Sequence, residues 1–67
     1  MNPELLTLER LLMFHDWYYD YSDDHSVWQR GQREHDAIGE EQRRLIHEVK
    51  VPLEEVMALT DKYRPKD

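Results

Sequence analysis

Histidine and aspartate side chains crowd the stretch HDWYYDYSDDHSVW, residues 15 to 28 of a 67-residue chain. Imidazole nitrogens and carboxylate oxygens are ligands for zinc and other divalent ions. Their spacing fits no metal motif, because HExxH is absent and the aspartate run lacks the mid-loop glycine and final glutamate of an EF-hand. We therefore expect no bound metal and no cofactor. The side chains with suitable donor atoms are His15, Asp16, Asp20, Asp23, Asp24, His25, His35 and Asp36.

Acid–base catalysis is a second chemistry that Asp23, Asp24 and His25 offer. It requires an enclosed pocket that shifts pKa values, and a turn in so short a chain rarely provides one. Nucleophilic catalysis has no cysteine to use, and the sequence holds neither Gly-x-Ser-x-Gly nor a glycine-rich phosphate loop. The sequence therefore predicts a protein that is not an enzyme.

Aromatic residues fill the same stretch, which holds both tryptophans and three of the four tyrosines. Such rings stack on nucleic-acid bases, with Arg30 and Arg33 available to phosphate, or they anchor protein interfaces. The neighbouring aspartates repel a phosphate chain, so the pattern favours a protein partner. Nucleotide or single-stranded nucleic-acid binding by stacking is the alternative. The predicted partner-binding residues are Trp17, Tyr18, Tyr21, Asp23, Asp24, His25, Trp28 and Arg30.

The charge balance narrows the partners further. Nine Lys and Arg against fifteen Asp and Glu give a net charge of −6, which disfavours nonspecific nucleic-acid binding. The acidic surplus leaves a DNA-mimicking inhibitor as another alternative. The chain has no cysteine, no run near the ~20 apolar residues of a membrane span, and a start, MNPELLTLER, unlike a signal peptide. We therefore expect a soluble cytoplasmic protein without membrane contact.

Helices are the elements that must position these residues. Glycine and proline are sparse and no segment alternates strictly between apolar and polar residues, so the fold class is all-α. Asn2 and Pro3 are typical of a helix start, and Pro52 biases the residue before it away from helical geometry. The expected helices are residues 3 to 20, 24 to 50 and a short third helix at 53 to 63, in a single domain of residues 1 to 67.

Apolar residues at spacings of three and four give the first two helices matching faces, which predicts an antiparallel helical hairpin. Folding it back at residues 21 to 25 places His15 near Gly31. A glycine within a helix lowers stability by about 1 kcal/mol relative to alanine. A ring of Tyr18 or Tyr19 packed against the backbone at Gly31 would explain why a glycine is found there. The aromatic stretch of residues 15 to 28 then forms the corner of the hairpin. This aromatic corner is either part of the core or a binding surface, and both interpretations stay open.

The first helix carries a second apolar side, formed by Leu6, Met13, Phe14 and Trp17. The third helix spans about 18 Å against about 26 Å for the first, so it covers only part of that side. Large exposed apolar patches on soluble proteins commonly mark interfaces. We therefore predict self-association through these four residues, with a dimer favoured.

The stretch FHDWYYDYSDDHSVWQRGQREHDAI, residues 14 to 38, resembles a segment of small uncharacterised proteins carried by tailed phages and prophages. In that segment an aromatic D-W-Y-Y run precedes S-D-D and a tryptophan. The resemblance covers about a third of the chain and supplies no catalytic residues. It implies a phage accessory protein, a class that often encodes small inhibitors or adaptors of host proteins.

Overall fold

The computed structural model describes residues 2 to 65, and within them every regular element is helical, which confirms the all-α prediction. None of the helices in this range is long and apolar enough to cross a membrane. The elements, in chain order, are the 3₁₀ turn η1 (Pro3–Leu5), α1 (Leu6–Phe14), α2 (Tyr18–Tyr21), α3 (His25–Arg44), the π-helical turn η2 (Leu45–Val49) and α4 (Leu53–Tyr63).

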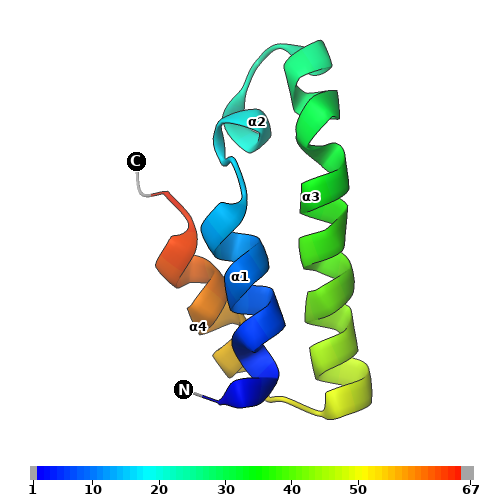
Figure 1. Cartoon of the computed structure of the whole chain (residues 1–67), viewed down its shortest axis with the longest axis vertical. Coiled ribbons are helices and arrows are strands. Elements are labelled where there is room, and N and C mark those ends of the chain that lie inside the picture. The colour runs from blue at the N-terminus through cyan, green and yellow to red at the C-terminus, as the bar shows by residue number, and fades with distance from the viewer. Residues whose placement is uncertain (1, 66–67) are drawn as a thin grey trace.

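The long helix α3 runs antiparallel to the η1–α1 segment, and α4 packs on the other side of α1 (Figure 1). The helices α1, α3 and α4 lie side by side and give the molecule the shape of a flat slab, with Cα extents of 36 × 23 × 16 Å. The core lies where η1, α1 and α4 meet the C-terminal half of α3 and the turn η2 that follows it. Its buried residues are Leu5, Leu8, Leu12, Ile38, Leu45, Val51, Val56 and Leu59.

The first helix is shorter than predicted. The chain leaves helical geometry at His15, whose ψ angle is 133°, and resumes it only in the single turn of α2. Asp16 explains the break, because its Oδ1 accepts a hydrogen bond from the Tyr18 N–H at 3.1 Å. A short polar side chain bonded two residues ahead competes with the helical hydrogen bonds of the backbone. The predicted single helix of residues 3 to 20 is therefore two helices joined by a turn.

The break changes which residue faces Gly31, since the side chain packed there is Tyr19 and not His15. A Cβ on Gly31 would overlap Cβ of Tyr19 and lie 2.8 Å from its Cγ. The expectation that a tyrosine ring needs this space is thus confirmed for Tyr19. The glycine lets α2 approach α3 closely enough to close the end of the hairpin.

The second predicted helix, residues 24 to 50, begins in the structure at His25 with Asp24 as N-cap, and it ends in the wider turn η2. Lys50 then adopts φ 69° and ψ 34°, the left-handed conformation that commonly ends a helix. The N–H groups of Lys50 and Val51 both donate to the carbonyl of Leu45, the second at 2.8 Å. Pro52 follows and starts α4, which covers the predicted range of the third helix.

Polar contacts fix α4 to its two neighbours. Tyr63 Oη donates to Glu9 Oε2 of α1 at 3.0 Å. Burial is the main cause, and this hydrogen bond the second, of a pKa of the Tyr63 phenol that is raised above its ordinary value. Gln42 Nε2 of α3 donates to Thr60 Oγ1 at 2.8 Å, while the buried Thr60 hydroxyl donates to the Val56 carbonyl. Because these bonds reach both partners, α4 is held to α1 and to α3.

We expect Gly31→Ala to lower the free energy of unfolding by about 1 to 3 kcal/mol, because the added methyl overpacks against Tyr19. Gly39→Ala is the matched control in the same helix. Its nearest neighbour is the flexible Arg43 guanidinium at 3.9 Å, so we expect a gain of about 1 kcal/mol from helix propensity. Urea unfolding followed by circular dichroism measures both, and equal gains for the two variants would contradict the close approach.

Candidate functional site

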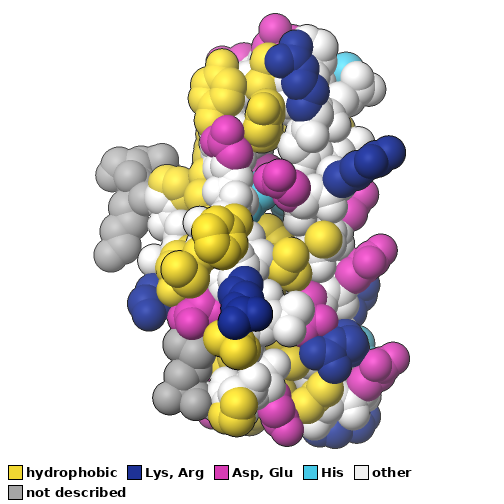
Figure 2. Space-filling model, in the orientation of Figure 1, with side chains coloured by type: hydrophobic (Ala, Val, Ile, Leu, Met, Phe, Trp, Pro, Cys, Tyr) yellow, Lys and Arg dark blue, Asp and Glu magenta, His cyan; other side chains and the backbone are white. Residues whose placement is uncertain are grey.

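The aromatic corner consists of α2, the connecting residues 22 to 24 and the first turns of α3. Tyr18 and Tyr21 are 66% and 56% exposed there, and Trp28 is 39% exposed. Figure 2 shows hydrophobic side chains gathered at this end of the slab with acidic side chains beside them. Three of the predicted partner-binding rings are therefore exposed at this end of the molecule.

The polar residues of the corner divide between structure and surface. Asp24 caps α3, since its Oδ1 accepts from the Ser26 backbone N–H at 2.9 Å and from the Ser26 hydroxyl at 2.7 Å. These hydrogen bonds hold the pKa of the Asp24 carboxyl below its ordinary value. Asp23, His25 and Arg30 are exposed, and the His25 ring stacks on Trp28 with centroids 5.8 Å apart. Asp24 thus builds the corner, and the other three shape its surface.

Trp17 lies away from this surface, in contrast to its predicted role as an outward anchor. It is half-buried, packs against the core and meets the His15 ring edge-on with centroids 4.9 Å apart. Together with Thr60 of α4 and Arg64, which follows α4, it lines a recess of about 90 Å³. The turn at residues 15 to 17 is the reason, because it rotates Trp17 out of the apolar face that a continuous helix would give it.

His15 forms an arrangement that the sequence does not reveal. Its side chain is 0% exposed, with Nε2 at 2.7 Å from Asp20 Oδ2 and Nδ1 at 3.1 Å from Glu34 Oε2. Each ring nitrogen of His15 therefore faces a carboxylate oxygen. His35 approaches the other Asp20 oxygen at 3.6 Å. The cluster of His15, Asp20, Glu34 and His35 thereby connects the end of α1, α2 and α3.

The contacts of the His15 cluster lie among its own side chains. Both nitrogens of His15 are occupied by carboxylates, so neither is free to take a proton from a substrate. In the part of the chain that the structure describes, no group of three or more His, Asp or Glu side chains is arranged to hold a metal ion. The arrangement is suited to fixing three segments in place.

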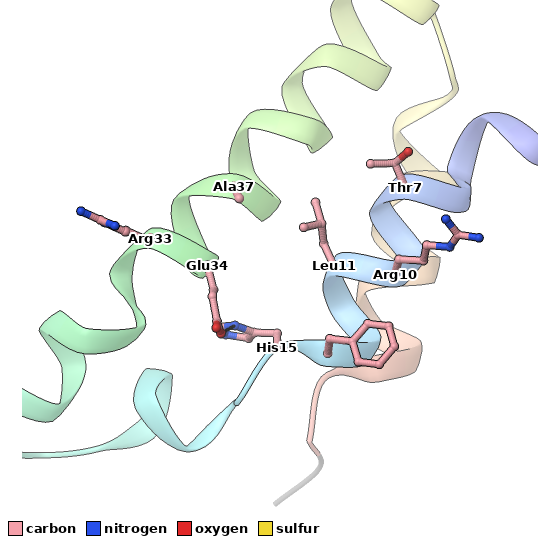
Figure 3. Close-up of a pocket in the computed structure, with 8 residues that line it drawn as sticks. Thr7, Arg10, Leu11, His15, Arg33, Glu34 and Ala37 are labelled. Atoms are coloured by element: carbon pink, nitrogen blue, oxygen red, sulfur yellow. Dashed lines mark hydrogen bonds and ion pairs between the residues drawn. The ribbon is translucent and has the colours of Figure 1, made fainter.

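A groove of about 560 Å³ opens between α1 and α3. Figure 3 shows the side chains of His15 and Glu34 meeting between the two helices, while Leu11 and Ala37 point into the gap. Arg10 and Arg33 stand on its outer edges, one on each helix. The groove thus has an apolar floor, one polar end and two cationic edges. The predicted hairpin of two helices with matching apolar faces included no such groove.

Three of the four predicted self-association residues are exposed along α1. Leu6 and Met13 are about half exposed, and Phe14, at the edge of the groove, is 80% exposed. Because α4 packs on the Glu9 side of α1, it leaves these three side chains open. Trp17 is separated from them by the turn that follows α1.

Comparison with protein-family models, curated proteins and solved structures finds no match to the chain. The resemblance of residues 14 to 38 to a phage-type segment therefore stays a prediction from sequence. Function must be inferred from the aromatic corner, the His15 cluster and the groove.

We expect His15→Leu to lower the free energy of unfolding by about 2 to 3 kcal/mol, because the carboxylates of Asp20 and Glu34 lose a buried hydrogen-bond partner. His35→Ala is the control, since its side chain is 64% exposed and its contact is longer. We expect it to change stability by less than about 0.5 kcal/mol. Urea unfolding of both variants measures the difference, and a His15→Leu protein as stable as wild type would refute a structural role for the cluster.

The lowered pKa of Asp24 gives a pH dependence with a defined sign. A carboxyl whose pKa is lower in the folded state contributes stability above its unfolded pKa and loses that contribution as pH falls through the folded pKa. Asp24→Asn keeps a capping oxygen but does not titrate. We expect the stability of wild type relative to Asp24→Asn to fall from about pH 5 to about pH 2 in urea unfolding. A difference independent of pH would show that the Ser26 bonds do not favour the carboxylate.

Proposed function

We propose that this protein is a non-catalytic binding protein, an accessory adaptor or inhibitor of the phage type that acts in the cytoplasm on a host protein. The aromatic corner is the surface that it uses. The observation that carries the proposal is the exposure of Tyr18 and Tyr21 on a short helix fixed in place by Tyr19 against Gly31. Tyrosines held on a rigid support lose little conformational freedom on binding, which is why they are common anchors.

The charges around the corner support a protein partner over a nucleic acid. Asp23 is exposed between the tyrosines and α3, and Asp16 is exposed at the turn before α2. These carboxylates would repel a phosphate chain at the place where bases would stack. One face of Trp28 is already covered by His25, so it offers a single face for stacking.

The same charges indicate the chemistry of the partner surface. An apolar recess that takes the two tyrosine rings, bordered by lysine or arginine, would complement the corner. Such opposite charge at the rim of an interface mainly raises the association rate and fixes orientation. Arg30, one turn further along α3, adds one positive charge, so the charge on the corner is unevenly distributed.

We also propose that the chain self-associates through the exposed face of α1, with a dimer favoured. Leu6, Met13 and Phe14 form that face. The accessible surface of the chain is 5081 Å², against about 4,500 Å² expected for a folded monomer of this mass. The excess follows from the flat shape of the slab, and pairing would reduce it.

For partner binding, we expect the double variant Tyr18→Ala/Tyr21→Ala to keep wild-type circular dichroism and to lose a captured host protein. The matched control is Leu53→Ala/Met57→Ala, which removes two exposed apolar side chains from α4. A protein captured by wild type and control but not by the corner variant is the expected result. If the tyrosine variant captures the host protein as well as wild type does, the proposal is wrong. It is also wrong if no host protein is captured and an oligonucleotide quenches the fluorescence of Trp28.

A further inference from the structure

We infer that the α1–α3 groove is the seat for Phe14 of a second copy of the chain, in a two-fold symmetric dimer in which each molecule inserts its ring into the groove of the other. The inference rests on the proposed self-association and names the site, the inserted side chain and the symmetry. Four features of the described residues support it.

The first feature is the position of Phe14 beside the groove. The ring is 80% exposed on α1, yet Phe14 is also one of the residues that line the groove. A projecting ring and an apolar recess on the same face make that face self-complementary. A two-fold axis between two such faces satisfies both insertions at once, which is the condition for a closed dimer.

The second feature is the chemistry of the groove floor. Leu11 and Ala37 face each other across the gap, and Thr7 lies one turn before Leu11 on α1. Leu11 is only partly buried although it packs against the core, so its outer side is left for another apolar group. The volume of about 560 Å³ exceeds that of a phenyl ring and leaves room for neighbouring side chains of α1 from the second copy.

The third feature is the local charge. The chain carries −6 in total, which opposes pairing of two copies at most places on its surface. Around the groove, however, Arg10 and Arg33 balance Glu34, and Asp16 lies next to Glu34, to which its N–H donates at 3.4 Å. Neither arginine forms an ion pair within residues 2 to 65. In an approximately antiparallel pairing that seats Phe14 against Leu11, Arg10 of each copy lies beside Asp16 of the other.

The fourth feature is the area available. The groove opens on a broad face of the slab, where hydrophobic side chains lie over α1 (Figure 2). The Cα outline of that whole face, 36 × 23 Å, corresponds to roughly 800 Å², which is the upper limit of what each copy could contribute to the interface. The aromatic corner lies at one end of the long axis, beyond the end of α1 (Figure 1).

The test separates the inserted ring from the groove. Phe14→Ala removes the ring, and Ala37→Phe fills the groove while leaving Phe14 in place. By sedimentation equilibrium, we expect each variant alone to raise the dimer dissociation constant at least about 100-fold, because both insertions are lost. An equimolar mixture restores one insertion, since the first variant offers an open groove and the second a free ring. We expect the mixture to associate about tenfold more tightly than either variant alone.

Leu53→Ala, an exposed position on α4, is the control and should leave the dissociation constant unchanged. The Phe14→Ala protein should also fold, because its side chain is mostly exposed. A wild-type dimer unaffected by Phe14→Ala and Ala37→Phe would overturn this inference while leaving self-association intact. A wild-type monomer at all concentrations would overturn both. Neither result bears on the corner, whose partner is tested separately with the tyrosine variant.

Discussion

Burial of the His15 ring between two carboxylates determines the course of the chain on both sides of it. A side chain with no solvent exposure must find partners for both nitrogens, and here they come from Asp20 of α2 and Glu34 of α3. A continuous helix would carry the following residues past α3, whereas the turn at Asp16 brings Asp20 back to the ring. The break in the helix and the burial of the histidine are therefore one structural event.

The same event sorts the aromatic residues. The turn sends Trp17 inward against the core and the edge of His15, and it brings Tyr19 onto Gly31. Tyr18 and Tyr21 are then left on the outer side of α2, because neighbouring positions in a short helix point in different directions. The run of aromatic residues thus serves two purposes, and the answer to whether it is core or surface differs from one ring to the next.

Local signals made much of the fold predictable from sequence. The cap at Asn2, the helix starting after Pro52 and the need for a ring at Gly31 each depend on a few adjacent residues or on helical periodicity. The break after α1 was not predictable in this way. It depends on the hydrogen bond from Tyr18 to Asp16 and on Glu34, 19 residues after His15. A charged helix face gives no sign that one of its carboxylates contacts a buried histidine.

The His15 cluster also separates the two proposed binding surfaces. It closes one end of the α1–α3 groove and contacts Asp20 of α2 at the base of the corner, so it lies between the two proposed surfaces. Two copies related by a two-fold axis with their α1 helices antiparallel would place their corners at opposite ends of the assembly. Such a dimer presents two identical sites, and a partner that is itself two-fold or repeated binds it with higher avidity than a single corner provides. Self-association would then serve the binding function directly.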